Sequence, residues 1–595
     1  MAGQTNASLA VPAGPSVGER LRALEPLVGQ FGREDLHAAL APVLEAMAGA
    51  PPGPAGASAV ESALAFCRQL YSAARSPDAL ALAHAAHDLA TRQGDRERQF
   101  RTSAACGILH GDAGDVVTAV EFHLRSLEAA TADGIPREMS RAWCNIGVAF
   151  STAGNYALAA SAFRRAYTLL DPDDANAPPR LFAGSNLASA CFHLGRYEEG
   201  LEFARRALED VTPEARRQDP QAEILLHRNF VNLLVATGRT PQAEHHAREA
   251  ARLAETLGTP RAAVAAAIAR ATWEVAAHRH EFALTRLQKA METARGLPAS
   301  LRETLVCTIR AEEAAGNPER ALVRLQELAD HVYRAAIDRV KGRLEIFRLQ
   351  EEPAPPTGPF TEHDRARLAA SVEPPGSPPE WTTFERLAQS AALRFDRTAR
   401  HGERVGALTQ AVASACGVDA LASLEIGLAS RLHDIGMASV PEAIAAGPGP
   451  RNAVERQLYL RHTEAGAEML EDAHHARLLL AREIARYHHA HWDGTGHPPQ
   501  VAGHAIPRPA RLCAVADTYD ALVCGEGSRE PRSMDEALAE LARAAGTRFD
   551  PEIVPRFDAL IREQAEELGL DTRSASGADG FGELVTSLQE DRGFL

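Results

Sequence analysis

The stretch that decides the fold of the first half of this 595-residue chain runs from Trp143 to Ala159 and reads WCNIGVAFSTAGNYALA. Its key feature is a glycine at a turn, Gly154, followed five positions later by a small residue, Ala159. The same pair recurs at Gly114 and Ala119, Gly195 and Gly200, Gly238 and Ala243, His278 and Ala283, and Gly316 and Ala321. Successive copies are roughly 40 residues apart, and the segments between them carry apolar residues at helical spacing. The sequence therefore predicts an array of paired antiparallel helices.

This pattern resembles the tetratricopeptide repeat, in which each unit is a helical hairpin with close-packed small residues. The spacing exceeds the roughly 34 residues usual for that repeat, which predicts longer loops between units. The resemblance implies a groove that binds a peptide or a partner domain. A purely structural spacer and a non-repetitive helical bundle are the alternatives.

The overall composition is that of an all-α protein. Apolar residues make up 45% of the chain and aromatic residues only 5%, while alanine and leucine, strong helix formers, are abundant. The formal net charge of −16 argues against binding to a nucleic acid duplex or an anionic membrane, which both require clustered Lys and Arg. No apolar run is long enough to span a bilayer, and we recognise no signal peptide. The 8 cysteines are scattered singly, which predicts reduced thiols and a cytoplasmic protein.

A second pattern, of histidines and aspartates, lies in the last third of the chain. The informative points are His401, His433-Asp434, His462, His488-His489 and Asp517. Each gap between them fits one helix plus a loop, so each point can lie on a different helix facing a common centre. Imidazole nitrogens and carboxylates are the ligands that divalent Mn, Fe, Ni or Zn prefer. Seven ligands exceed the needs of one tetrahedral metal and suit two metals bridged by a carboxylate.

Four separated motifs then resemble the HD-GYP subfamily of the HD phosphohydrolase superfamily. They are LHDIG at 432–436, HHAHWDGTGHP at 488–498, the pair IPRPAR at 506–511 and AVADTYDAL at 514–522, and FDP at 549–551. The resemblance implies an all-α domain with two divalent metal ions (Fe, Mn or similar). The implied metal ligands are His401, His433, Asp434, His462, His488, His489 and Asp517, with His433 and Asp434 also catalytic.

The activity implied by this resemblance is hydrolysis of the bacterial second messenger cyclic di-GMP to pGpG or GMP. The substrate-binding residues implied are His497, Arg511 and Arg529. The metals would lower the pKa of a shared water and neutralise the phosphodiester. The sequence thus predicts a bacterial signalling phosphodiesterase that acts on a cyclic dinucleotide or related phosphoester and is regulated by a protein partner through the repeats.

The sequence departs from the subfamily pattern where substrate phosphates would be held. Met437 replaces a lysine, His497 replaces the tyrosine of Gly-Tyr-Pro, and Glu526 replaces an arginine. Arg397 stands where members with a third metal carry glutamate, which favours two metals over three. Ala490 replaces a glutamate after the paired histidines. These changes keep two alternatives open: a catalytically weak or inactive effector that acts by protein–protein interaction, and an HD hydrolase of a different nucleotide.

The connection between the two halves has a heptad-like stripe at Tyr333, Ile337, Val340, Leu344 and Phe347. Such a stripe either packs on the neighbouring repeat or forms a homodimer that transmits a signal. The predicted divisions are 1–60 flexible N-terminal segment, 61–325 repeat array, 326–350 connecting helix, 351–380 Pro-rich linker, 381–565 metal-dependent domain and 566–595 C-terminal tail.

Overall fold

The computed structural model describes residues 16–25, 33–51, 53–72, 76–170, 178–218, 221–295, 297–349, 380–396, 399–445, 452–471, 473, 475–525, 530–568, 570, 572 and 584–588. These residues form α-helices and short 3-10 helices, with no strand among them, so the all-α prediction is confirmed. No helix in this described part is long and apolar enough to cross a membrane.

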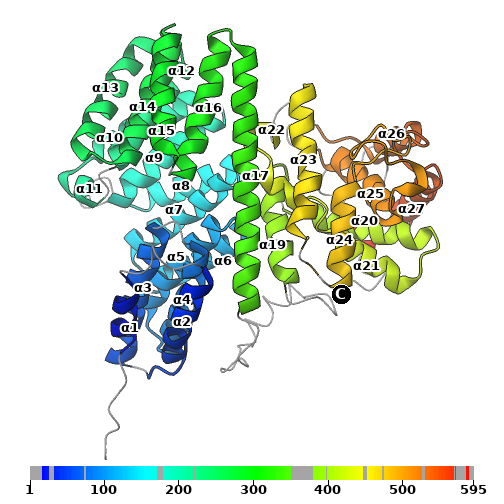
Figure 1. The fold of residues 1–595 in the computed structure, drawn as a ribbon, viewed down its shortest axis with the longest axis horizontal. Helices are drawn as coiled ribbons and strands as arrows, with labels where there is room; N and C mark the ends of the chain where they lie inside the picture. The colour runs from blue at the N-terminus through cyan, green and yellow to red at the C-terminus, as the bar shows by residue number, and fades with distance from the viewer. Residues whose placement is uncertain are drawn as a thin grey trace, which may run out of the picture.

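The first half is a stack of helical hairpins, seen on the left of Figure 1. Its helices are α1 Val17–Leu24, α2 Arg33–Ala48, α3 Pro54–Ser72, α4 Ser76–Arg92, α5 Arg96–Asp112, α6 Val116–Ala132, α7 Pro136–Thr152, α8 Tyr156–Thr168, α9 Pro178–His193, α10 Tyr197–Glu209, α11 Pro213–Gln218, α12 Ala222–Ala236, α13 Thr240–Leu257, α14 Pro260–Ala276, α15 His280–Ala294, α16 Pro298–Ala314 and α17 Pro318–Leu349.

The turns of these hairpins lie where the repeated glycines predicted them. Gly114, Gly154, Gly195, Gly238, His278 and Gly316 all have positive φ, between 58° and 85°. Glycine adopts this left-handed conformation without the steric cost that a Cβ brings, and it ends a helix by redirecting the chain. The residue five positions later is buried in each copy, which lets the paired helices approach closely.

The prediction of longer loops was wrong for the first units, where the extra length lies in the helices. Helices α5, α6 and α7 have 17 residues each. The turns between them contain only the cap residues and a glycine, such as Ala113 to Asp115. Longer helices with alanine-rich faces extend each hairpin along its own axis, so the repeat grows without exposing unpaired backbone groups.

The N-terminal segment differs from the flexible chain predicted for 1–60. Residues of α1 and α2, including Val17, Leu21, Leu40 and Met47, are buried against α3 and α4 in one apolar core. The breaker-rich sequence at 49–58 therefore separates two packed helices, and α3 begins within it at Pro54. Proline is tolerated in the first turn of a helix because its missing N–H would have no partner there.

The second half is a bundle of helices, shown on the right of Figure 1. Its elements are α19 Trp381–Ala392, α20 His401–Ala415, α21 Ala420–Ser430, the 3-10 helix η2 Ile435–Ser439, α22 Glu442–Ala445, α23 Ala453–Met469, α24 Ala476–Tyr487, the 3-10 helix η3 Gly503–Ala505, α25 Arg508–Cys524, α26 Met534–Arg543 and α27 Ile553–Glu567. In the predicted tail, Leu584, Val585 and Leu588 are buried in the core of this bundle. The predicted linker, apart from Glu380, lies outside the described residues.

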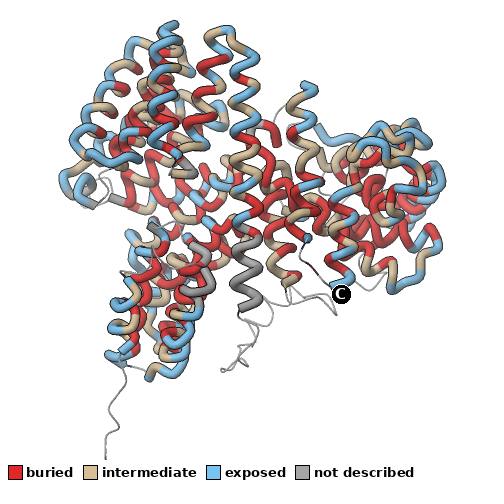
Figure 2. The backbone as a smooth tube through the Cα atoms, viewed as in Figure 1, coloured by how far each residue is buried: buried red, intermediate tan, exposed pale blue. Residues whose placement is uncertain are grey.

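Helix α17 joins the two halves, and it runs between them in Figures 1 and 2. It completes the last hairpin with α16, and its Ile337 and Val340 are buried in the core of the C-terminal bundle. The Tyr333 hydroxyl donates a hydrogen bond to Glu468 at 2.6 Å. The first part of the heptad stripe therefore packs on the C-terminal bundle. The sequence had predicted instead that the stripe packs on the neighbouring repeat or forms a homodimer. The side chains of Leu344 and Phe347 lie outside the described residues, and the homodimer remains a prediction.

We expect Ile337→Ala to destabilise the C-terminal bundle by about 2–4 kcal/mol, because it removes buried methyl groups and leaves a cavity. Val323→Ala on the same helix is the matched control, since Val323 is 51% exposed whereas Ile337 is 6% exposed. Urea denaturation of both variants measures the difference. Equal unfolding midpoints would show that α17 contributes nothing to the bundle.

Candidate metal centre

The predicted ligands lie on five different helical segments that meet at one buried point. His401 begins α20, His433 and Asp434 follow α21, and His462 lies within α23. His488 and His489 follow the last turn of α24, and Asp517 lies within α25. The side chains of His433, His462 and His488 are almost completely buried. The prediction that one residue group per helix faces a common centre therefore agrees with the structure.

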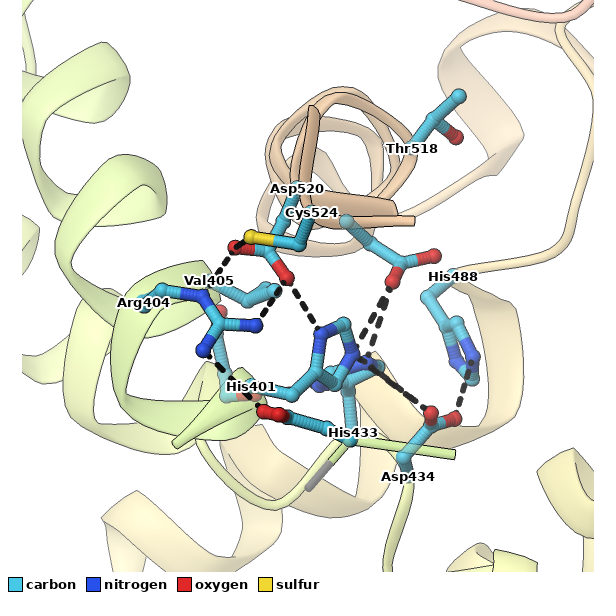
Figure 3. Close-up of polar contacts among 12 residues, drawn as sticks. His401, Arg404, Val405, His433, Asp434, His488, Thr518, Asp520 and Cys524 are labelled. Atoms are coloured by element: carbon cyan, nitrogen blue, oxygen red, sulfur yellow. Dashed lines mark hydrogen bonds and ion pairs between the residues drawn. The ribbon is translucent and has the colours of Figure 1, made fainter. Parts of the chain in front are cut away.

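The Asp434 carboxylate divides the cluster into two groups. Its Oδ2 atom lies 3.8 Å from His401 Nε2 and 3.5 Å from His433 Nε2. Its Oδ1 atom lies 3.3 Å from His462 Nε2 and 3.4 Å from His488 Nε2. One carboxylate thus faces a pair of histidines with each oxygen, as Figure 3 shows for His401 and His488.

Two further predicted ligands, Asp517 and His489, extend the two groups. Asp517 Oδ1 lies 3.4 Å from His401 Nε2 and 3.5 Å from His433 Nε2. His489 offers a nitrogen within 4.8 Å of ligand atoms of His462 and His488. The arrangement therefore contains two sets of nitrogen and oxygen donors, each large enough to hold one divalent cation, with Asp434 between them.

Backbone carbonyl groups fix the orientation of three of the imidazole rings. The Nδ1 atoms of His433, His462 and His488 lie 2.9 Å from Ser430 O, 2.7 Å from Tyr459 O and 3.0 Å from Ala485 O. A carbonyl oxygen only accepts, so each Nδ1 carries the proton and each Nε2 presents a lone pair to the centre. Fixing the tautomer in this way is how proteins prepare a histidine as a metal ligand.

Asp520, for which the sequence predicted no role, holds a fourth imidazole ring, that of His401. The Nδ1 atom of His401 donates to Asp520 Oδ2 at 2.7 Å, and Arg404 donates to the same carboxylate at 2.6 and 2.9 Å. Arg404 in turn pairs with Asp396 at 3.1 Å. Asp520 stands three positions after Asp517 on α25, which places both carboxylates on one helix face. That spacing is the signal that could have found it.

The resulting donor set fits divalent cations. His401 Nε2 and His433 Nε2 are 3.2 Å apart, as are His462 Nε2 and His488 Nε2. Because the Nδ1 atoms of His462 and His488 already carry protons, this pair brings two lone pairs face to face in a buried site, and a cation between them relieves that repulsion. At the other pair, burial lowers the pKa of His401, but Asp517 and Asp520 outweigh burial and hold its pKa above the usual range, so positive charge is favoured there as well. Histidine nitrogens and carboxylates without thiolates suit Mn, Fe, Ni or Zn.

The local electrostatics also favour bound cations. Burial raises the pKa of Asp434, but the neighbouring His433, His462 and His488 outweigh burial and hold its pKa well below the usual range. Burial and the neighbouring histidines lower the pKa of His489. The carboxylate is thus anionic and the imidazole neutral, which are the forms that bind metals.

The predicted substrate-binding residues have different surroundings. His497 is partly buried next to a candidate ligand: its backbone N–H donates to His489 O at 2.9 Å, and its Nε2 lies 3.6 Å from Glu464 Oε1. Arg511 forms an ion pair with Asp550 and donates to Ile506 O at 3.0 Å, so its guanidinium is engaged in holding this loop. Arg529, Glu526 and Arg397 lie outside the described residues.

The side chain of Met437 does not lie where the sequence comparison placed a phosphate-binding residue. Its side chain is fully buried in an apolar cluster with Ala329 of α17, Ala391 of α19 and Leu458 of α23. An apolar thioether gains free energy by packing in this contact, where a charged ammonium group would lose its hydration. The methionine that replaces lysine therefore contributes to the apolar packing between η2 and α17.

Comparisons with known proteins agree with this division of the chain. Residues 385–553 match the HD domain and residues 140–170 match the tetratricopeptide repeat, which confirms both resemblances. The chain is 36% identical over 180 residues to a cyclic di-GMP phosphodiesterase of Thermotoga maritima, covering 30% of this chain and 49% of that protein.

Two further relatives have the same kind of match. The chain is 35% identical over 187 residues to the cyclic di-GMP phosphodiesterase response regulator RpfG of Xanthomonas campestris pv. campestris, covering 31% of this chain and 49% of that protein. It is 33% identical over 168 residues to the 3′3′-cGAMP-specific phosphodiesterase 2 of Vibrio cholerae, covering 28% of this chain and 32% of that protein. The chain spans about half or less of the length of these curated relatives.

Removing the carboxylate that holds His401 is expected to weaken metal binding. We expect Asp520→Asn to lower the affinity for Mn²⁺ by about 10- to 100-fold, the usual effect of losing a partner of a metal-bound histidine. Asp558→Asn, which alters a surface ion pair with Arg562, is the control. Competition with a fluorescent chelator measures both affinities, and an unchanged affinity in Asp520→Asn would exclude the positioning role.

Proposed function

We propose that this protein is a metal-dependent phosphodiesterase that hydrolyses a cyclic dinucleotide, with the repeat array binding a protein partner that regulates it. The observation that carries this proposal is the division of six imidazole and carboxylate side chains into two donor sets around Asp434. Two cations in these sets, when bound, would supply Lewis acidity toward phosphate oxygens and lower the pKa of water.

The protein's own side chains would do the positioning. Asp434 and Asp517 contribute negative charge that keeps both cations in place, and the carbonyl-anchored histidines keep their lone pairs aimed at the centre. A preorganised site of this kind needs little rearrangement as charge develops on phosphorus oxygens, which is the main contribution that an enzyme makes to phosphoryl transfer.

The choice of substrate class rests on the relatives that match the C-terminal half. Their names specify cyclic di-GMP for two of them and 3′3′-cGAMP for the third. These substrates share a ring closed by two phosphodiesters and differ in one base. We therefore propose cyclic dinucleotides as the class, with cyclic di-GMP as the first candidate.

One observation favours a second candidate, a catalytically weak effector that retains the metal centre. Met437 is fully buried, so its position contributes no cation toward a phosphate. A chain that keeps its metal ligands but lacks this charge would bind metals and hydrolyse slowly. Hydrolysis of 3′3′-cGAMP in preference to cyclic di-GMP would be an outcome of the same assay.

The assay uses the full chain reconstituted with Mn²⁺ or Fe²⁺ and offered cyclic di-GMP or 3′3′-cGAMP, with products separated by chromatography. We expect a linear dinucleotide or mononucleotide to appear, and the double variant His433→Ala/Asp434→Ala to show only background conversion. Asp558→Asn should retain full activity. Absence of turnover of both cyclic dinucleotides, despite two bound metals per chain, would contradict the proposed hydrolysis and favour the effector.

Removal of metal provides a second test that does not depend on turnover. We expect Mn²⁺ at about 100 times its Kd to stabilise the folded protein by about 2.7 kcal/mol per site, because it binds the folded state alone. The melting temperature should therefore rise with Mn²⁺, fall after treatment with EDTA, and be insensitive to both in His433→Ala/Asp434→Ala. An equal response of that variant would place the metals elsewhere.

A further inference from the structure

We propose that one face of the repeat array is a docking surface for an acidic segment of a partner protein, and that Glu442 of the C-terminal bundle occupies this surface within the same chain. This face, the acidic-docking surface, is formed by Tyr156, His193, Arg302 and Arg310. The inference extends the proposed regulation by the repeats, but it is tested by binding alone and does not depend on any hydrolytic activity.

The contact begins at the turn between α7 and α8. A Cβ atom built on Gly154 would lie 3.3 Å from the carboxyl carbon of Glu442 and 3.4 Å from its Oε1 atom. The side chain of Glu442 therefore rests directly on the backbone of this turn, where a larger residue than glycine would press on it. Glu442 is the first residue of α22 and belongs to the C-terminal bundle, so the two halves of the chain meet here.

Two stacked aromatic rings lie beside this carboxylate. Tyr156, the first residue of α8, stacks on His193 at the end of α9, with ring centroids 4.0 Å apart and an interplanar angle of 4°. Burial raises the pKa of Tyr156, and the charge of Glu442 and its hydrogen bond with the hydroxyl raise it further. The hydroxyl therefore stays protonated and acts as a donor toward the carboxylate.

Arginines from distant repeats complete the surface. Burial lowers the pKa of His193; the charge of Glu442 raises this pKa, and the charges of Arg310 and Arg302 on α16 and of Arg228 on α12 lower it. Arg228 already pairs with Glu303 at 2.7 Å. Arg302 and Arg310 are both exposed, so they are the cations available to an incoming carboxylate. A tyrosine hydroxyl and two exposed arginines match the negative charge of an acidic peptide segment.

Glu442 lies on a segment that also holds the metal centre. From Asp434 the chain passes through η2 to α22, and Met437, Val440 and Ile444 pack with Ala329 of α17. Arg394 donates to Met437 O at 3.0 Å and to Val440 O at 2.6 Å. A partner that takes the place of Glu442 would therefore remove one of the contacts that fix the segment after Asp434.

The test uses the full chain and a fluorescein-labelled synthetic peptide of alternating Glu and Ala residues, with an otherwise identical Gln-Ala peptide as the probe control. Fluorescence polarisation at low ionic strength measures Kd. We expect Glu442→Gln to bind the acidic peptide on the order of three- to tenfold more tightly than the unaltered chain, because the internal competitor loses its charge. Glu292→Gln, at an exposed site on α15, should not change Kd.

Adding Arg302→Glu or Arg310→Glu to Glu442→Gln should abolish this gain, whereas Arg295→Glu, at the exposed residue that directly follows α15, should preserve it. All these positions are at least partly exposed, and the helix content of each variant is checked by circular dichroism. The proposal is overturned if Glu442→Gln leaves Kd unchanged, or if the Gln-Ala peptide binds equally well. Binding with normal affinity by a chain that shows no hydrolysis would leave it standing and contradict only the proposed activity.

Discussion

The C-terminal half of the molecule depends on one constraint: four imidazole nitrogens must present their lone pairs to the two oxygens of the Asp434 carboxylate. Each nitrogen lies 3.3 to 3.8 Å from an Asp434 oxygen. Uncharged or anionic donors crowded in a buried site are unfavourable without a cation. The surrounding helices must therefore hold the donors in place, and bound metals would convert their mutual repulsion into binding energy.

Close packing of backbone around η2 supplies much of that restraint. A Cβ atom on Gly436 would lie 1.9 Å from His462 O and 2.5 Å from Gly466 N. Only glycine allows α23, which carries His462, to approach the segment that follows Asp434 so closely. The distance between the two ligands is thus set by contact between main chains, which is stiffer than contact between flexible side chains.

The 3-10 helix η2, which follows Asp434, also lies between the candidate metal centre and the repeats. Helix α19 contacts the array through Ser390, whose hydroxyl accepts from Val116 N at 3.0 Å at the start of α6, and through Arg386, which pairs with Glu121 at 2.8 Å. Helix α17 contacts η2 through the cluster that buries Met437. Helix α17 of the array therefore packs directly on the segment that follows Asp434, and α19 packs on that segment while it contacts α6 of the array. A change in the array has these two physical routes to the candidate ligands.

Sequence alone determined the features that depend on local geometry or on ligand chemistry. Gly154 and its equivalents predicted the turns because residues that tolerate positive φ end helices in this way. The histidine–aspartate spacing predicted which side chains meet at the candidate metal centre. The tertiary structure decided the role of Asp520, the burial of Met437 and the contact of Glu442 with the repeats. Those depend on residues far apart in the chain, as with His401 and Asp520, whose hydrogen bond spans 119 positions. Such contacts cannot be predicted from spacing along the sequence, because the packing of the whole core decides which helices lie next to each other.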